Sequence, residues 1–395
     1  MANQKNTFVY VGNWQTRPSS WGLPPVAGYG FGICRYNTET GELDLIKSVF
    51  DGISVGQANL DPKRNVLYCV DEVMTLPGHA VGGGGQVYAF AIDPQTGDLT
   101  EINHQPSYGS LPAYAAVDAT GKYLIVSNHT GKWPVTKVVK EASGKYRTVA
   151  EYDDATVVLF RLHDDGSIGE PCDVYTHPGN GGALDSQTHA NLHSVMMSPS
   201  GKLFAVCDKG NDEILLFQIN RKTEKLELCG GRSVATIPGS SPRYSVFHPK
   251  RPYLFVNYET KAVVASFRYD EDGTLDLICT VNALPDGCAD KHGMQSDIRI
   301  HPSGKYLYGL IRGINAVSVF GIKEETGEIQ KIQTIDLDGA GPRGCAVSPD
   351  GRFLIVAALT SGEALVWAIA EDGKLSPTGR KIKQPYPGNV TFFPA

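Results

Sequence analysis

Short apolar runs alternate with polar turns along the whole chain, and one turn phrase separates pairs of runs seven times. The phrase is acidic or polar residues, usually a Gly, and then an apolar residue. Its copies occupy residues 39–43, 95–99, 164–168, 222–226, 271–275, 325–329 and 371–375. Six copies hold a Gly, which supplies the positive φ of a tight hairpin, whereas the fourth has Glu224. Each copy therefore predicts a hairpin turn between two strands.

A second phrase interleaves with the first: an apolar strand, a turn that usually contains Pro, and another apolar strand. Clear copies occupy residues 198–201, 301–304 and 348–351, and looser copies begin at residues 61, 118 and 248. A seventh apolar run, residues 390–394, ends the chain without a following turn. We expect it to pair with the N-terminal run at residues 8–11.

Each repeat therefore predicts four short strands joined by tight turns. Four-stranded units at this period are typical of propeller blades. The expected fold is all-β: a single seven-bladed β-propeller domain over residues 1–395, with four-stranded antiparallel blades. The N- and C-terminal strands close the ring in one blade, since an open ring would leave unpaired edges.

Composition and charge narrow the classes of function. The net charge is −6 and the pI is about 5.9, which argues against a general nucleic-acid surface. The chain holds no run of 18 apolar residues, and residues 1–6 lack the apolar stretch of a signal peptide. We expect a cytoplasmic protein without membrane or nucleic-acid partners, as a monomer or weak homo-oligomer. The eight Cys form no C-x-x-C pair and are expected to be buried small apolar residues.

The repeat also identifies equivalent positions in different blades. Six residues before the Pro of each turn, or before Ala119, a first ring begins the innermost strands: Gly56, Ala113, His193, Arg243, Ser296, Arg343 and Gly388. Ten residues after the same anchor, a second ring ends the second strands: Glu72, His129, Lys209, Glu259, Arg312 and Leu359. Because the two strands are antiparallel neighbours, both rings are expected at one mouth of the central channel.

Charged side chains crowded at one opening need partners, since unpaired buried charge is costly. One interpretation is a set of inter-blade ion pairs that only seals the channel. The other is a binding pocket, which four long insertions at the same end favour. Three insertions follow second strands, at residues 14–28, 73–85 and 130–154, and one precedes a first strand, at residues 179–192.

Several segments at these positions resemble the seven-bladed lactonase family, which includes propeller-type 6-phosphogluconolactonases and fungal carboxymuconate-lactonizing enzymes. The resemblance covers essentially the whole chain. It rests on residues 9–13, on 242–249 followed by 256–259, on 311–313 and on 193–195. Two positions depart from the family pattern: Ile311 replaces the usual Asn, and Asn191 stands where the family often has His.

The resemblance implies an active-site set of His193, Arg243, Glu259 and Arg312, all members of the two rings. Lactone hydrolysis needs a base for water and cations for the developing oxyanion. Glu259 or His193 would be the base, with Glu259 preferred because its Arg neighbours are expected to depress its basicity only partly. Arg243 and Arg312 would clamp an anionic group. Further substrate-binding candidates are Arg343, Lys209, His129, Glu72, Gln295 and His189.

The expected activity is hydrolysis of a sugar-derived or other anionic lactone without a metal or other cofactor. His189 and His193 are four residues apart but lie in a loop, which offers no helical metal-binding face. A cycloisomerase that closes a carboxylated, muconate-like substrate would use the same pocket. A non-catalytic propeller that binds partner proteins is the alternative from another class, since fold alone does not decide function.

Overall fold

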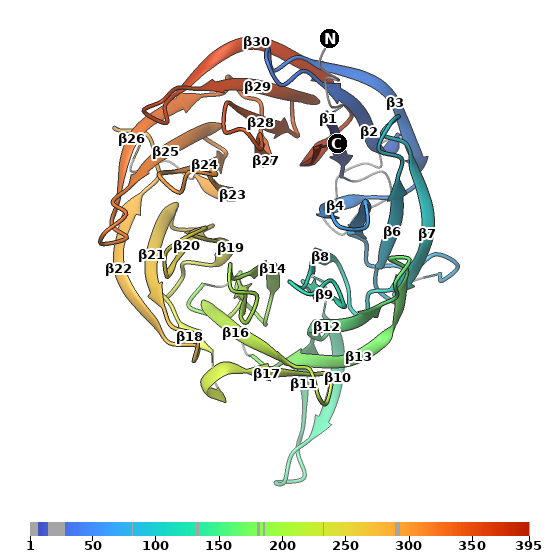
Figure 1. Cartoon of the computed structure of the whole chain (residues 1–395). Coiled ribbons are helices and arrows are strands. Elements are labelled where there is room, and N and C mark those ends of the chain that lie inside the picture. Colours follow the sequence, from blue (N-terminus) through green and yellow to red (C-terminus); the bar gives the residue numbers. More distant parts are fainter. Residues whose placement is uncertain are drawn as a thin grey trace.

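Seven antiparallel sheets, six of four strands and one of five, surround a central axis and form a closed ring (Figure 1). The computed structural model describes residues 7–394 apart from residues 15–27, 81, 132–133, 180–181, 185, 232 and 289–292. Helix in the described part is one 3-10 turn, Cys229–Gly231. The predicted all-β propeller with seven blades is confirmed.

We number the blades in chain order, with blade 7 holding both ends of the chain. The innermost strands of blades 1 to 7 are β4 (Val55–Asp61), β8 (Pro112–Val117), β14 (Leu192–Met197), β19 (Pro242–Phe247), β23 (Met294–Ile300), β27 (Pro342–Val347) and β31 (Pro387–Pro394). The second strands are β5 (Val66–Asp71), β9 (Tyr123–Asn128), β15 (Phe204–Asp208), β20 (Tyr253–Tyr258), β24 (Tyr306–Arg312), β28 (Phe353–Ala358) and β1 (Thr7–Asn13).

The outer half of each blade continues the same meander. The third strands are β6 (Gln86–Ile92), β12 (Ala155–Leu162), β16 (Glu213–Asn220), β21 (Val263–Tyr269), β25 (Ala316–Ile322), β29 (Glu363–Ile369) and β2 (Tyr29–Tyr36). The rim strands are β7 (Leu99–Pro106), β13 (Ile168–His177), β17 (Lys225–Leu228), β22 (Leu275–Asn282), β26 (Ile329–Asp336), β30 (Leu375–Lys383) and β3 (Leu43–Asp51). The two-residue strand β18 (Val234–Ala235) pairs with β16.

Burial follows from the stacking of blades face to face. Every residue of β5, β9, β15, β20 and β28 is buried, because each second strand has a neighbouring blade on both faces. Rim strands such as β7 and β22 keep several exposed residues. The apolar runs of the sequence are therefore the second and third strands of the blades.

The last blade is built from the two ends of the chain. Strand β31 pairs antiparallel with β1 from Thr7 opposite Pro394 to Asn13 opposite Pro387. The innermost strands also contact one another from blade to blade, including β31 with β4 and β27 with β31. The predicted closure of the ring is confirmed, and it leaves no open edge between the first and last blades.

The glycines of the outer hairpin turns do more than supply positive φ. Gly97, with a φ of 76°, lies against the ring of Phe8 from blade 7, and a Cβ at this position would come within 2.5 Å of that ring. The Tyr10 hydroxyl donates to the Gly97 carbonyl oxygen at 2.9 Å. The turn of one blade is thus a packing surface for the blade beside it.

Gly97→Ala should lower the free energy of unfolding by about 2–4 kcal/mol, from backbone strain together with overpacking against the buried Phe8. Gly339 is a matched control, since it has the same φ of 76° and a Cβ added there would meet no atom within 4 Å. Gly339→Ala should cost about 1–2 kcal/mol. Urea unfolding followed by tryptophan fluorescence gives both values, and equal losses would contradict the packing role.

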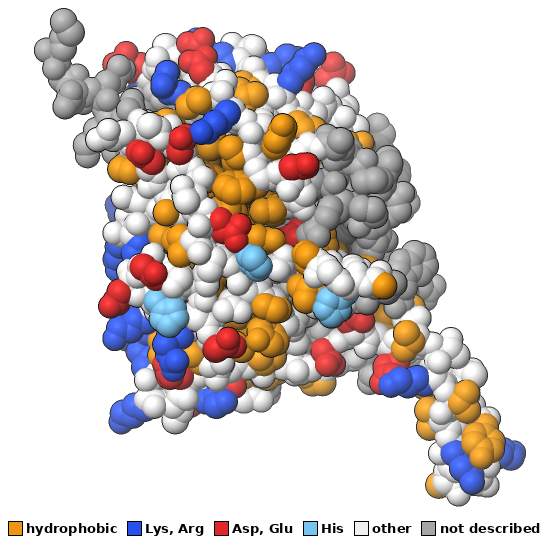
Figure 2. Space-filling view, turned by 90° about the vertical axis from the view of Figure 1, so that its right-hand side faces the viewer, with side chains coloured by type: hydrophobic (Ala, Val, Ile, Leu, Met, Phe, Trp, Pro, Cys, Tyr) orange, Lys and Arg blue, Asp and Glu red, His pale blue; other side chains and the backbone are white. Residues whose placement is uncertain are grey.

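The insertion at residues 130–154 differs from expectation. It forms a separate hairpin of β10 (Val135–Lys140) and β11 (Tyr146–Glu151), which projects from the rim and stands clear of the body (Figures 1 and 2). All residues of β10 are exposed. The prediction that this whole insertion helps to build the mouth is therefore wrong for the hairpin, although its base returns to the ring. In the insertion at 14–28, residues 15–27 lie outside the described part.

Two further expectations from the sequence concern the cysteines and membrane-spanning segments. All eight cysteines are free, and five of them are buried. No helix in the described part of the chain is long and apolar enough to cross a membrane.

Candidate functional site

A β-bulge marks the mouth end of every innermost strand. The pairing register shifts by one residue there in all seven blades, at the positions that hold Gly56, Ala113, His193, Arg243, Ser296, Arg343 and Gly388. These are the members of the first ring that the sequence repeat predicts. A bulge interrupts the regular alternation of side chains and can re-aim one of them. The fold therefore places each first-ring residue at a β-bulge at the mouth end of its innermost strand.

The second ring is held by a repeated backbone hydrogen bond. In six blades the backbone amide of the residue after the second strand donates a hydrogen bond at 2.8–3.0 Å. The acceptor is the backbone carbonyl oxygen of the residue just before the innermost strand. The donors are Glu72, His129, Lys209, Glu259, Leu359 and Trp14. In blade 5 the equivalent residue, Arg312, still pairs within the ladder with Met294.

Trp14 is the seventh member of the second ring, and the sequence repeat did not identify it. The counting rule starts from the turn between the first and second strands, and in blade 7 these strands are opposite ends of the chain. The end of the first apolar run was the available signal. Trp14 is buried, and the Arg343 guanidinium lies 4.2 Å from the centre of its ring, a cation–π contact.

Glu259 is the centre of the largest ion cluster at the mouth. Lys209 Nζ of blade 3 lies 2.6 Å from Glu259 Oε2, and the Arg312 guanidinium of blade 5 donates to Glu259 Oε1. Arg243 Nε of blade 4 lies 3.5 Å from Oε2, while its Nη1 donates to the backbone oxygen of Ser296. Three cations from three blades therefore share one carboxylate.

A second cluster joins blades 6, 7 and 1. Arg343 Nη2 donates to Glu72 Oε2 at 2.9 Å, with Trp14 beside the guanidinium. Small first-ring residues make room for it: a Cβ on Gly56 would lie 2.5 Å from Glu72 Oε2, and one on Gly388 would lie 3.1 Å from Trp14 Cβ.

His193 and His129 lie between the charged groups. Their ring centres are 5.6 Å apart, and His193 also packs on Tyr244 at 5.0 Å. His129 Nε2 lies 3.5 Å from Lys209 Nζ. His193 Nδ1 is buried and has no hydrogen-bond partner among the described residues.

Electrostatics give the carboxylate and the lysine at the centre unusual proton affinities. Burial by itself would raise the pKa of Glu259, but attraction by Lys209, Arg312 and Arg243 outweighs it and holds the pKa well below its usual range. Burial, with repulsion from the arginines, lowers the pKa of Lys209 to about 8 although Glu259 opposes the shift. The expectation that Glu259 loses only part of its basicity is therefore wrong for this arrangement.

The two histidines are held neutral. Burial, followed by the nearby positive charges of Arg243 and Lys209, lowers the pKa of His193 well below 6.5. Burial, followed by the positive charge of Lys209, also lowers the pKa of His129 well below 6.5. Around neutral pH both imidazoles are therefore uncharged. A neutral imidazole is better suited to take a proton from water than a carboxylate bound by three cations.

Two predicted substrate-binding residues are placed elsewhere. The Gln295 side chain is fully buried and donates to the backbone oxygens of Val263 at 2.5 Å and Tyr258 at 3.4 Å. These contacts join blade 5 to blade 4, and contact of Gln295 with substrate stays a prediction. His189 Nε2 is hydrogen-bonded to Thr130 Oγ1 at 2.7 Å, and its ring stacks on Tyr152. His189 thus anchors the insertion beside the mouth.

The eight charged or imidazole side chains of the two rings carry unequal charge. Lys209, Arg243, Arg312 and Arg343 are basic, whereas only Glu72 and Glu259 are acidic. With both histidines neutral, four positive and two negative charges leave an excess of two positive charges. Arg312 and Lys209 are the most accessible of the four cations, with side chains 25% and 16% exposed. An approaching anion meets these two first.

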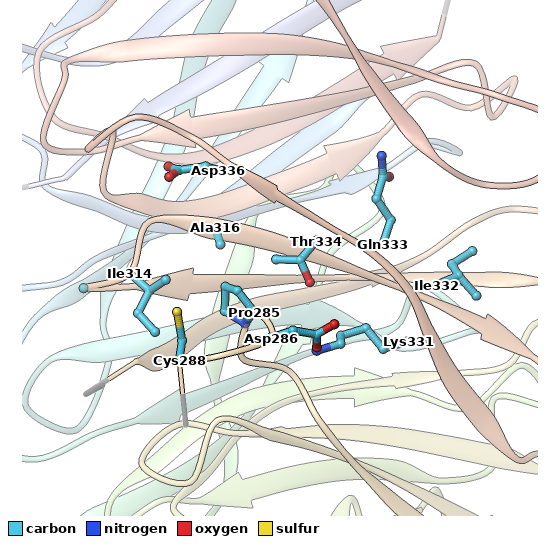
Figure 3. Close-up of a pocket in the computed structure, with 11 residues that line it drawn as sticks. Pro285, Asp286, Cys288, Ile314, Ala316, Lys331, Ile332, Gln333, Thr334 and Asp336 are labelled. Carbon is cyan, nitrogen blue, oxygen red and sulfur yellow. The ribbon is translucent and has the colours of Figure 1, made fainter. Parts of the chain in front are cut away.

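A pocket of about 630 Å³ lies outside this cluster, between blades 4 and 5 (Figure 3). It is bordered by the loop after β22, the turn from β24 to β25, and strand β26. Its Lys331 is paired with Asp286 at 3.0 Å, and the Asp286 side chain is almost fully exposed. Because the two rings gather far more charge in a buried setting, we place the candidate site at the mouth.

Comparison with known proteins points to one family. The family model described as "Lactonase, 7-bladed beta-propeller" matches residues 9–140 and 130–392. A protein of Formosa agariphila named 6-phosphogluconolactonase is 30% identical over 359 residues, which cover 90% of this chain and 93% of the relative. A Bacillus subtilis protein of the same name is 27% identical and covers 79% and 81% of the two chains.

Solved structures agree on the fold. A structure of a Bacteroides fragilis protein has 26% identity and a TM-score of 0.81, and the match covers 99% of both chains. The periplasmic gluconolactonase of Pseudomonas aeruginosa has 21% identity and a TM-score of 0.82, and covers 98% of this chain and 99% of its own. The second likeness bears on the fold alone.

Proposed function

The chain belongs to the 7-bladed β-propeller lactonases and is a lactone hydrolase, and we propose that its substrate is a sugar-derived lactone with an anionic group, of the 6-phosphogluconolactone class. Support comes from the names of two relatives and from the charge at the mouth. Neither the cycloisomerase nor the scaffold alternative gains support from these relatives. Cytoplasmic location and a monomeric or weakly oligomeric state remain predictions, and one structural relative is periplasmic.

The excess of two positive charges at the mouth carries the proposal. Inter-blade pairs that only seal a channel would be expected to balance, since each unpaired buried charge is costly. Here three cations converge on Glu259, and burial, with repulsion from Arg243 and Arg312, lowers the pKa of Lys209. A bound phosphoryl group would neutralise the excess, and arginine forks match its oxygens.

The proposed reaction is one addition and one elimination. Water attacks the lactone carbonyl carbon while His193 accepts its proton. Lys209 stabilises the oxyanion of the tetrahedral intermediate, and Arg312 holds the anionic group of the substrate. The ring C–O bond then breaks, and the departing oxygen takes the proton from His193. The product is the open hydroxy acid, and His193 returns to its neutral form.

In this mechanism Glu259 is a positioning residue. It stays ionised and holds Lys209 and Arg312 on either side of one point, so that their charges face the substrate before it arrives. Preorganised charge of this kind avoids reorganisation at the moment of reaction. Arg243 and Arg343 add positive charge behind this pair.

A panel of sugar lactones tests the function, with acid release measured at pH 6.5 and corrected for spontaneous hydrolysis. We expect phosphorylated lactones to be hydrolysed with a higher kcat/KM than their unphosphorylated counterparts. Arg312→Gln should lower kcat/KM for the phosphorylated lactone by about 10- to 100-fold, the value of a charge-assisted hydrogen bond, and affect the neutral lactone less.

The exposed pair of Arg161 and Glu224 provides a control far from the mouth. Arg161→Gln should leave both lactones unaffected. No enzymatic acid release from any lactone would contradict the proposed activity. Equal losses for the two lactones in Arg312→Gln would instead contradict only the role of Arg312 as an anion clamp.

A further inference from the structure

Three side chains with metal-ligand chemistry converge between blades 2 and 3, outside the two rings. His177 ends β13, Asp208 ends β15 and Glu213 begins β16. His177 Nε2 lies 3.2 Å from Asp208 Oδ2 and 3.3 Å from Glu213 Oε2. All three ligand atoms lie within 4.8 Å of one another. These strand ends are on the same side of the ring as the mouth.

The two carboxylates are an unfavourable pair without a counter-charge. Asp208 and Glu213 are directly opposite each other on neighbouring strands, where like charges are destabilising. Asp208 is fully buried and the Glu213 side chain is 27% exposed. A divalent cation would compensate both negative charges.

Two of the three ligand atoms lack hydrogen-bond partners, whereas the other polar atom of each of these two side chains has one. Neither His177 Nε2 nor Asp208 Oδ2 has a hydrogen-bond partner in the described part of the chain, and both are buried. Asp208 Oδ1 accepts from the amides of Asn191 at 2.6 Å and Gly210 at 2.8 Å. His177 Nδ1 lies 3.4 Å from the Tyr175 hydroxyl. Such outer contacts are typical of metal ligands, because they orient the donor atom.

We propose that His177, Asp208 and Glu213 form a binding site for one divalent transition-metal ion, with Zn²⁺ as the best match. One imidazole and two carboxylates suit Zn²⁺ better than Mg²⁺ or Ca²⁺, which prefer oxygen ligands. In a tetrahedral Zn²⁺ site with bonds of about 2.0–2.1 Å, neighbouring ligands are about 3.3 Å apart. The separations of 3.2 and 3.3 Å agree with this edge.

A metal ion at this site would affect the mouth by fixing the positions of residues that belong to it. Lys209 is the next residue after Asp208. His177 is the last residue of β13, and the insertion at residues 179–192 begins two residues later. Gln187 of that insertion donates to the Lys209 backbone oxygen at 2.8 Å. A bound ion would therefore fix blade 3 to the rim strand of blade 2 and hold the segment that leads to His193. This inference goes beyond the proposed hydrolysis and does not depend on it.

Metal binding by the full-length, tag-free chain tests the inference directly. The protein is stripped with a chelator and dialysed against Zn²⁺, and bound metal is measured by atomic spectroscopy. We expect one Zn²⁺ per chain that excess Mg²⁺ and Ca²⁺ do not displace. Co²⁺ in its place should give the visible d–d absorption of a tetrahedral site. Both results read the site without any activity measurement.

His177→Gln and Glu213→Gln should each weaken Zn²⁺ binding by roughly 100-fold or more, beyond the 10- to 100-fold loss typical of outer contacts. Glu213→Gln is the variant least expected to impair folding, because its side chain is partly exposed. The exposed pair of His104 and Glu101, 2.7 Å apart, is a matched control. His104→Gln should bind Zn²⁺ like the wild type.

Zn²⁺ should also raise the melting temperature of the stripped wild type and of His104→Gln, but not of Glu213→Gln. Less than half a Zn²⁺ per wild-type chain would overturn the proposal. So would equal Zn²⁺ binding by the wild type and by both His177→Gln and Glu213→Gln. Either result would leave the hydrolysis proposal intact, since the lactone panel tests that separately.

Discussion

Glu259→Gln is expected to lower kcat/KM for an anionic lactone by at least about 100-fold, while binding of 6-phosphogluconate, the product of the proposed reaction, is retained or strengthened. Breaking a buried ion pair costs about 3–5 kcal/mol, a loss large enough to displace Lys209 and Arg312 from their shared point. The variant also has one negative charge fewer at the mouth, which favours an anion. Loss of turnover without loss of anion affinity separates positioning from simple substrate binding.

The pH dependence of the same variant gives an independent readout. The carboxylate of Glu259 raises the pKa of Lys209, which nevertheless lies at about 8 because of burial. Anion affinity in the wild type should therefore fall as pH rises through about 8 and Lys209 loses its proton. In Glu259→Gln this fall should occur at a lower pH. Calorimetric titration with 6-phosphogluconate between pH 6 and pH 9 measures both curves.

Glu72→Gln is the matched control for the central carboxylate. Glu72 is buried at the same mouth, but its partner is Arg343 rather than the cluster of three cations. Glu72→Gln should reduce turnover less than Glu259→Gln does. In Glu72→Gln the affinity for the anion should still fall as pH rises through about 8, as in the wild type. If Glu259→Gln keeps wild-type turnover, the positioning role is excluded. If its turnover falls but the pH curve does not move, the electrostatic link to Lys209 is excluded.

His193→Gln is expected to lower kcat by about 10²- to 10⁴-fold, the usual contribution of a general base, with little change in KM. The substitution keeps a polar side chain of similar size, and the hydrogen bond from Ser127 to the His193 backbone oxygen is unaffected. Initial rates at several lactone concentrations separate kcat from KM. The loss should persist between pH 6 and pH 8, because the pKa of His193 lies well below 6.5.

His129→Gln distinguishes the two neighbouring histidines. His129 Nε2 faces Lys209 Nζ at 3.5 Å and Nδ1 lies 3.3 Å from the Thr130 backbone oxygen, so its nitrogens are already engaged. Its replacement should reduce kcat much less than that of His193. A larger loss of kcat in His129→Gln than in His193→Gln would mean that His129, and not His193, takes the proton from water. Unchanged kcat in both variants would return the base to Glu259.

The sequence by itself determined the number of blades, the closure of the ring and most of the two rings. Turn chemistry is local: a Gly such as Gly97 marks a hairpin wherever it occurs, and seven copies of one phrase imply seven similar units. Counting from a turn then reaches the same structural position in every blade. His193, Arg243, Glu259 and Arg312 were found in this way, and the structure brings them to one mouth.

Counting failed where the repeat itself is interrupted. Trp14 follows the one second strand that no turn connects to its innermost partner. The hairpin of β10 and β11 is an addition to blade 2 that no other blade contains in the described residues. Gln295 stands beside Ser296 of the first ring, but the bulge places its side chain against blade 4. A position within a repeat predicts where a residue lies, not where its side chain points.

Only the tertiary structure decided which side chains meet and what their charges do to one another. Glu259 is ionised and a poor base because Lys209 and Arg312 arrive from the two blades on either side. His177 reaches Asp208 across a blade boundary, which no spacing along the chain reveals. The physical reason is one of range: turns depend on a few consecutive residues, whereas proton affinity and metal ligation depend on atoms within a few ångströms in space.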